Sequence, residues 1–145
     1  MKIELGYGDG IQTAEIPDRN ILKILRANPV SSGEKGGSVV REALKNPIAS
    51  APLADIVRPG EKTVIITSDI TRPMPTWDVM PAVLDELYAA GVSPEDITLV
   101  FALGSHRAHT EEEKKHLAGE RAYREISCVD SDPQDCVHIG TTEAG

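Results

Sequence analysis

The sequence predicts an α/β fold, a Rossmann-like three-layer domain with a mostly parallel sheet, preceded by an N-terminal β-hairpin. Two short apolar runs carry this prediction, each followed by a polar loop and a helical pattern: KTVIIT (62–67) and DITLVFAL (96–103). Continuous runs of this kind are typical of strands buried on both faces of a parallel sheet. A strand, a loop and a helix, repeated twice, make a βαβα unit with right-handed crossovers. The chain of 145 residues has the length of one domain with one core.

Composition narrows the classes of partner. The formal net charge of −8 argues against nucleic acid, because binding a phosphate backbone needs a surplus of Lys and Arg. The chain has no apolar stretch of membrane-spanning length, and its first ten residues lack the apolar core of a signal peptide. Cys128 and Cys136 do not form a C-x-x-C pair and are typical of reduced thiols in a cytosolic protein. We therefore expect a cytoplasmic protein that binds neither nucleic acid nor a membrane.

The N-terminal segment is expected to hold the hairpin. Residues 2–16 (KIELGYGDGIQTAEI) alternate in polarity on either side of a Gly-rich middle, a pattern typical of two strands and a turn. The glycines do not link a buried strand to a helix, so they are not a dinucleotide-binding loop. NILKILRAN (20–28) fits either a short helix or an extended segment, and SSGEKGG (31–37) is expected to be a flexible loop.

Two short helices are expected before the first buried strand. SVVREALKN (38–46) reads as a helix with Ser38 as its N-cap and Asn46-Pro47 at its end. SAPLADIVRPG (50–60) is a second short helical turn, closed by Pro59-Gly60.

Three further elements follow from local signals. Thr76 is the expected N-cap of a helix over 77–90, Gly91 is its expected C-cap, and its apolar stripe consists of Val79, Met80, Val83, Leu84 and Leu87. Thr110 and Glu113 have the T-x-x-E spacing of a capping box at the start of another helix. REISCVD (124–130) and CVHIG (136–140) are expected to add short strands.

Polar loops follow the two buried strands: SDITRPMP (68–75) and GSHRAHT (104–110). Ligands of open parallel sheets bind beyond the carboxyl ends of the strands, so these loops define the candidate site. They contribute Asp69, Thr71, Arg72, His106, Arg107 and His109.

Each of these residues also has an ordinary structural alternative. Asp69 fits a turn cap, Arg72 fits an ion pair with Asp69 or another surface carboxylate, and His106 fits a hydrogen bond to a backbone carbonyl. We favour a site because the groups occur together at adjacent strand ends. Arg72 then serves as an anion clamp, and His106, just before a helix N-terminus, serves as a neutral base. A metal site of His106 and His109 is less favoured, because the spacing supplies no third ligand.

The stretches EALKNPIASAPLADIVRPGEKTVIITSDITRPMP (42–75) and AGVSPEDITLVFALGSHRAHTEEE (90–113) resemble the N-terminal domain of the nickel-dependent lactate racemase family. The family pattern has a D-x-T-R-P loop after one strand and a G-x-H-R loop after the next. Both are present, as 69–73 and 104–107, and the resemblance extends from about Arg41 to the end of the chain.

The resemblance implies a racemase or epimerase, an isomerase that moves a hydride from a 2-hydroxy acid and returns it on either face. It implies a nickel-pincer nucleotide (pyridinium-3,5-bisthiocarboxylate mononucleotide nickel) as cofactor, tethered to a lysine. His106 matches one of two catalytic histidines that act on the substrate hydroxyl. Asp69, Ile70, Thr71 and Arg72 match the cofactor-binding loop, and Arg72 is the expected anchor of the substrate anion.

The sequence departs from the family at two positions: Ile70 stands where lactate racemase itself has a histidine, and Ala108 stands where a proline is common. The second histidine, the tethering lysine and the nickel-ligating histidine belong to a region beyond Gly145. We therefore expect 1–145 to be the single N-terminal α/β domain of a longer two-domain enzyme, inactive without its C-terminal domain. Its expected partners are a small 2-hydroxy acid and the rest of its own polypeptide.

Two other interpretations remain for comparison. The first is a non-catalytic α/β binding module for a nucleotide or a small carboxylate, which predicts ligand binding by this chain alone. The second, an ordinary Rossmann dehydrogenase, is disfavoured because no strand–GxGxxG–helix unit is present. His109, which is unusual for the family, is expected to be a bystander beside His106.

Overall fold

The computed structural model describes residues 1–29, 36–72 and 74–143. It divides into two compact units, Met1–Ser32 and Gly33–Gly145, which are described separately. The predicted loop 31–37 lies outside the described residues except for Gly36 and Gly37. Pro73 of the first polar loop (68–75) also lies outside them.

The first unit is the predicted hairpin. Strands β1 (Lys2–Tyr7) and β2 (Gly10–Glu15) pair antiparallel, from Lys2↔Glu15 to Tyr7↔Gly10. Gly8 has a φ of +56°, a conformation that glycine adopts without strain at the first position of a two-residue hairpin turn. A 3₁₀ turn follows at Asp18–Asn20, and residues 21–29 form neither helix nor strand. The helical alternative for this segment is therefore wrong beyond Asn20.

The second unit begins with two short helices, α1 (Gly37–Lys45) and α2 (Leu53–Ile56). Both were predicted, and Asn46 ends the first of them as expected, with its side-chain amide donating to the carbonyl of Glu42. The predicted N-cap is wrong, because Ser38 lies inside the helix and Gly36 occupies the cap position. Gly36 has a φ of +66°, which lets the chain enter the helix without a side-chain cap.

The sheet has three parallel strands in the order β3–β4–β5: Thr63–Ser68, Ile97–Ala102 and Ser127–Asp130. Helix α3 (Thr76–Ala89) connects the first pair, and α4 (Glu111–Ala118) and α5 (Glu120–Glu125) connect the second. The predicted α/β class, with a parallel sheet and an N-terminal hairpin, is confirmed. The strand predicted at 136–140 is wrong, since those residues form no strand.

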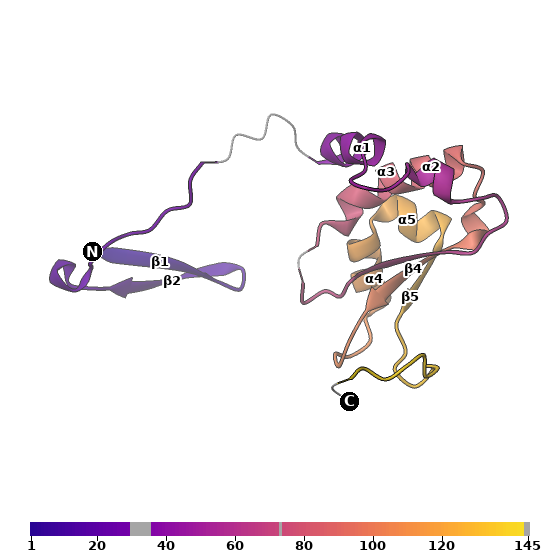
Figure 1. The fold of residues 1–145 in the computed structure, drawn as a ribbon. Helices are drawn as coiled ribbons and strands as arrows, with labels where there is room; N and C mark the ends of the chain where they lie inside the picture. Colours follow the sequence, from indigo (N-terminus) through magenta and orange to yellow (C-terminus); the bar gives the residue numbers. More distant parts are fainter. Residues whose placement is uncertain (30–35, 73, 144–145) are drawn as a thin grey trace. The chain divides into compact units, whose positions relative to one another are not determined.

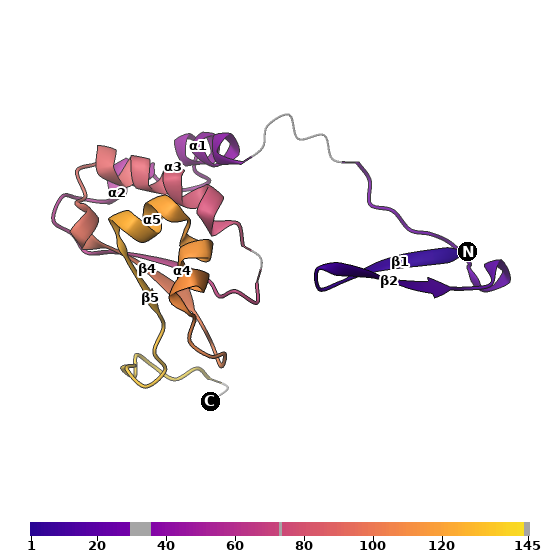
Figure 2. The same ribbon diagram turned by 180° about the vertical axis from the view of Figure 1, so that it is seen from behind.

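Helices α3, α4 and α5 lie together on one side of the sheet in both views of the ribbon (Figure 1 and Figure 2). Met80, Leu84 and Leu87 of the predicted stripe are fully buried, and they form one core with Ile97, Leu99 and Phe101 of β4. Each such buried side chain stabilises the fold by about 1.5–3 kcal/mol. None of the helices in the described residues is both long and apolar enough to cross a lipid bilayer.

The ends of α3 differ from one another in how well they were predicted. Gly91 has a φ of +85°, and the N–H of Val92 donates to the carbonyl of Leu87, so the predicted left-handed C-terminus is confirmed. The predicted cap at Thr76 is wrong by one residue, because Pro75 occupies the cap position. The hydroxyl of Thr76 instead lies 2.6 Å from that of Thr67, which joins the start of the helix to the end of β3.

The second face of the sheet is open in the described chain. Val64 and Ile66 of β3 are 60% and 72% exposed, and Val129 of β5 is also exposed. The expectation that residues 62–67 are buried on both faces is therefore wrong for these residues, and two of the three predicted layers are formed. The sequence could not predict this open face, because an apolar run does not show whether its second face is covered by this chain or by another polypeptide.

Candidate active site

The candidate site lies at the carboxyl ends of β3 and β4. Ser68 pairs with Ala102 at the last position of the register, so the two polar loops leave the sheet side by side. They enclose an open pocket of about 610 Å³, whose lining includes Ser68, Asp69, Arg72, Met74, Gly104 and His106. A pocket of this size suits a small-molecule ligand. The predicted meeting of the two loops at one edge of the sheet is therefore found in the structure.

Asp69 and His106 form a close pair in this pocket. Nδ1 of His106 lies 2.5 Å from Oδ2 of Asp69, and Oγ1 of Thr71 donates to the other carboxylate oxygen at 2.8 Å. Asp69 is buried, whereas the His106 side chain is nearly half exposed. Because the carboxylate accepts the proton on Nδ1, the lone pair of Nε2 is left available for other groups. This arrangement can take a proton from a ligand hydroxyl.

The carboxyl of Asp69 stays ionised at neutral pH. Burial raises its pKa, but the hydrogen bonds from Thr71 and His106 and the charge of His106 outweigh burial and hold the pKa below its usual range. Asp69 is thus a fixed negative charge and an orienting acceptor. This is more than the turn cap that the sequence left as its alternative role.

Arg72 is exposed at the rim of the pocket. Its backbone N–H donates to the carbonyl of Asp69, but its guanidinium makes no ion pair with any side chain among residues 1–29, 36–72 and 74–143. The Asp69 carboxylate that the sequence offered as a partner is occupied by His106 and Thr71. Arg72 therefore presents an uncompensated cation suited to an anionic ligand.

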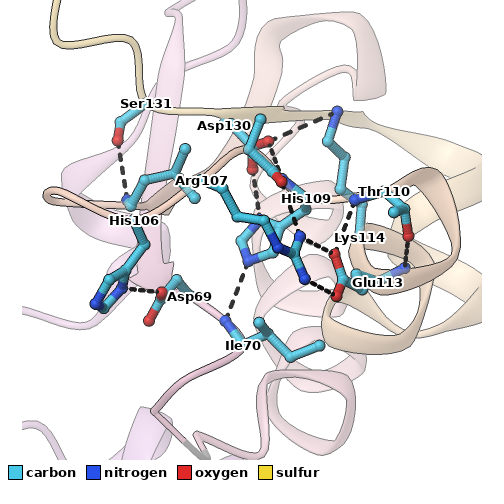
Figure 3. A network of polar contacts seen from close by, with 12 residues as sticks. Asp69, Ile70, His106, Arg107, His109, Thr110, Glu113, Lys114, Asp130 and Ser131 are labelled. Carbon is cyan, nitrogen blue, oxygen red and sulfur yellow. Dashed lines mark hydrogen bonds and ion pairs between the residues drawn. The ribbon is translucent and has the colours of Figure 1, made fainter.

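Arg107, the other arginine of the two loops, has a structural role. Its guanidinium makes two hydrogen bonds to the Glu113 carboxylate, at 2.7 and 2.8 Å (Figure 3). Glu113 also accepts from the N–H of Thr110, whose hydroxyl accepts from the N–H of Glu113, so the predicted capping box is confirmed. The hydrogen bonds from Arg107 and Thr110 lower the pKa of Glu113 to about 2. Arg107 is bound to this helix start.

His109 is buried, and it is hydrogen bonded through its ring to Asp130 at the end of β5 (Figure 3). From the sequence, His109 was expected to be a bystander, and neither Asp130 nor its neighbour Ser131 was predicted to belong to the site. Ser131 accepts a hydrogen bond from the N–H of Leu103, so the third strand also supports the loop after β4. The signal was the position of Asp130 at the carboxyl end of an expected strand (124–130), at the same edge of a parallel sheet.

The two histidines are held by different carboxylates. His106 is bonded to Asp69, and His109 is bonded to Asp130. Across the described part of the chain, no three His, Cys, Asp or Glu side chains gather as they would around a metal ion. A two-histidine metal site therefore has no third ligand among these residues.

Comparisons with known proteins point to one family. Residues 7–145 match the family model described as the lactate racemase N-terminal domain. Two proteins named lactate racemase are similar over 99% of this chain. That of Thermoanaerobacterium thermosaccharolyticum is 33% identical over 150 residues, and that of Lactiplantibacillus plantarum is 32% identical over 149 residues.

A solved structure agrees with this similarity. The lactate racemase apoprotein from Thermoanaerobacterium thermosaccharolyticum has a TM-score of 0.80 to this structure at 31% identity, covering 100% of this chain and 34% of that one. The chain spans about a third of the length of these relatives, 34% and 35% of the two curated sequences.

Proposed function

The chain belongs to the family of lactate racemase N-terminal domains, and from this premise we propose that it carries half of the active site of a racemase or epimerase acting on a small 2-hydroxy acid. The observation that carries the proposal is the Asp69–His106 pair in a pocket whose rim holds Arg72, a cation with no ion-pair partner among the described residues. A base and an anion clamp are the two groups that a 2-hydroxy acid requires. They would act on its hydroxyl and on its carboxylate.

His106 is proposed as the base that removes the proton of the substrate hydroxyl. Asp69 holds the imidazole with its proton on Nδ1, so Nε2 can accept the hydroxyl proton and return it later. The ionised carboxylate beside the ring stabilises the imidazolium that forms. The loss of this proton favours departure of the hydride from the neighbouring carbon.

Arg72 is proposed to bind the substrate carboxylate. A guanidinium forms two parallel hydrogen bonds to a carboxylate, which fixes the orientation of the acid as well as its affinity. Gly104 supports close approach to the same pocket. It has a φ of +59° and open space where a Cβ would stand, so backbone and ligand can meet there.

The residues of the pocket fit the nickel-pincer nucleotide that the family implies. The loop Asp69, Ile70, Thr71 and Arg72 lines or borders the pocket, and the Arg72 cation suits an anionic group of the cofactor or the substrate, while the Thr71 hydroxyl donates to Asp69 and keeps that carboxylate in place. When bound, this cofactor supplies the acceptor for the hydride of the substrate. This chain binds and orients the substrate and exchanges its hydroxyl proton. The tethering lysine and the nickel ligand are proposed to come from the rest of the polypeptide.

The rest of the polypeptide is proposed to be a C-terminal domain that completes the site. Support comes from the open apolar face of Val64, Ile66 and Val129, since exposed apolar patches mark surfaces that contact other protein. The 145-residue chain is accordingly expected to be inactive alone. A cytoplasmic location is proposed with it, and both cysteines, Cys128 and Cys136, are free thiols.

The proposal is tested with the full-length protein carrying its cofactor, given one enantiomer of a 2-hydroxy acid in D₂O. Chiral chromatography is expected to detect the other enantiomer, and mass spectrometry is expected to find no deuterium on carbon 2, because the hydrogen moves as a hydride. Incorporation of deuterium would indicate proton abstraction and contradict the hydride class. No interconversion, together with binding of the acid by the 145-residue chain, would favour the binding-module alternative.

A further inference from the structure

The side chain of His109 is almost completely buried next to the site. The side chain is 1% exposed, although it lies in a loop whose neighbours from Gly104 to Ala108 are exposed. Its ring packs edge-on against Phe101, with the ring centres 5.4 Å apart. A buried imidazole needs a partner for each nitrogen, because an unsatisfied polar group costs about 1–3 kcal/mol.

Both nitrogens of His109 have such a partner. Nδ1 lies 2.6 Å from Oδ1 of Asp130, and Nε2 lies 3.1 Å from the backbone nitrogen of Ile70 (Figure 3). The backbone N–H of His109 donates to the second oxygen of Asp130 at 2.9 Å. Asp130 thus binds His109 at two points and fixes the position of its ring.

These contacts determine where the proton of His109 resides. The N–H of Ile70 can only donate, so Nε2 must accept and carry no proton. The single proton of the neutral ring is then on Nδ1, where it is donated to Asp130. An imidazolium would place a donor opposite the Ile70 N–H and break this hydrogen bond.

The hydrogen bond to Ile70 ties the loop after β3 to the ends of the other two strands. Ile70 stands between Asp69 and Thr71, and its own side chain is 40% exposed and anchors little. His109 therefore holds the backbone next to Asp69 from outside this loop, whereas His106 contacts the Asp69 side chain. Through Asp130 that hold extends to β5.

We infer that His109 is a positioning residue, which holds the Ile70 N–H and thereby fixes Asp69 where its carboxylate orients His106. The expected effect of His109 on kcat rests on the proposed function, whereas its effect on the loop and on the tautomer of His106 does not. Without the acceptor at Nε2 the loop is released, the Asp69–His106 pair loosens, and His106 is no longer held in one tautomer. A residue that served packing alone would affect stability but leave His106 unchanged.

Two matched variants of the full-length protein separate these roles. His109→Gln places an amide oxygen near the position of Nε2 and keeps an acceptor for Ile70. His109→Asn reaches only the position of Nδ1, so it keeps a donor for Asp130 and leaves the Ile70 N–H without an acceptor. His116→Gln, on the exposed side of α4 against Trp77, is the control.

Racemisation kinetics give the first readout. We expect His109→Asn to lower kcat about 10- to 100-fold with little change in KM, as for other groups that orient a reacting residue. His109→Gln and His116→Gln are expected to stay within a few-fold of the parent protein. A folded His109→Asn protein with the parent kcat would overturn the inference.

Nitrogen NMR of protein labelled at its histidines gives a second readout that needs no activity. In the parent protein, His109 and His106 are both expected to carry their proton on Nδ1. In His109→Asn, His106 is expected to become a mixture of tautomers, and in His109→Gln it is expected to remain as in the parent.

The parent spectrum alone can overturn the inference, even if the Asn variant fails to fold. A His109 protonated on Nε2 would show that the Ile70 hydrogen bond is absent. The two proposals also fail separately. Lack of enantiomer interconversion by the parent enzyme would refute the proposed function, while the tautomers of His106 and His109 test the inference about His109 independently.

Discussion

Asp69 and His106 are 37 positions apart in the sequence, yet the carboxylate Oδ2 of one lies 2.5 Å from Nδ1 of the other. The parallel pairing of β3 with β4 brings them together, because it places both loops at one edge of the sheet. The contact fixes the orientation of the imidazole and leaves Nε2 of His106 available to a ligand in the pocket. It is the geometric basis of the proposed chemistry.

Asp69→Asn is expected to lower kcat of the full-length enzyme about 100-fold, because the amide removes the charge that orients His106. Circular dichroism should show an unchanged fold. Asp96→Asn is the control, since Asp96 pairs with Lys62 at the amino ends of β3 and β4, at the opposite edge of the sheet from the site. Equal kcat values for Asp69→Asn and the parent enzyme would show that this carboxylate has no part in catalysis.

Arg72→Gln is expected to raise KM for the 2-hydroxy acid about 10- to 100-fold, the equivalent of a charged hydrogen bond of about 1.5–3 kcal/mol. Steady-state kinetics over a range of substrate concentrations measure this change. Arg107→Gln provides the matched control, because that guanidinium is already bonded to Glu113. If both variants raised KM equally, Arg72 would not be the specific anion clamp.

The Glu113 carboxyl is expected to titrate at a pKa of about 2 in carbon NMR of the chain. A lowered folded pKa means that Glu113 contributes stability fully above its ordinary value of 4.5 and loses that contribution as the pH falls from 4.5 toward 2. Arg107→Gln should move the midpoint up toward 4.5, whereas Arg124→Gln should leave it in place. A midpoint near 4.5 in the parent chain would refute the Arg107–Glu113 contact.

Leu99→Ala is expected to lower the free energy of unfolding of the 145-residue chain by about 2–5 kcal/mol, because Leu99 is fully buried. Val64→Ala, on the open face of the neighbouring strand, should cost less than about 1 kcal/mol. Urea unfolding monitored by circular dichroism measures both. In the full-length protein the cost of Val64→Ala should rise, since the proposed C-terminal domain covers this face; an equally small cost there would count against that packing.

Local signals in the sequence were enough to predict several elements of this fold. The capping box of Thr110 and Glu113 and the left-handed Gly91 depend on residues within a few positions of each other. The position of the candidate site at the strand ends was also predictable, because apolar runs followed by polar loops place Asp69, Arg72 and His106 at one edge of a parallel sheet. These features need only chain-local rules and the general topology of parallel sheets.

Features that depend on tertiary contacts could not be predicted. His109 is buried through Asp130 and Ile70, which are 21 and 39 positions away, and no local pattern indicates those partners. The Thr76 hydroxyl bonds Thr67 instead of capping its helix for the same reason. Segment 136–140 resembled a strand in composition, but no described strand pairs with it.

The most direct test of the central claim is kcat for racemisation by the full-length, cofactor-loaded enzyme with His106 replaced by alanine. Loss of the base should lower kcat by a factor of about 10²–10⁴, while cofactor content stays unchanged and His116→Gln retains the parent rate. A His106→Ala enzyme that interconverts the enantiomers at the parent rate would contradict the assignment of His106 as the catalytic base.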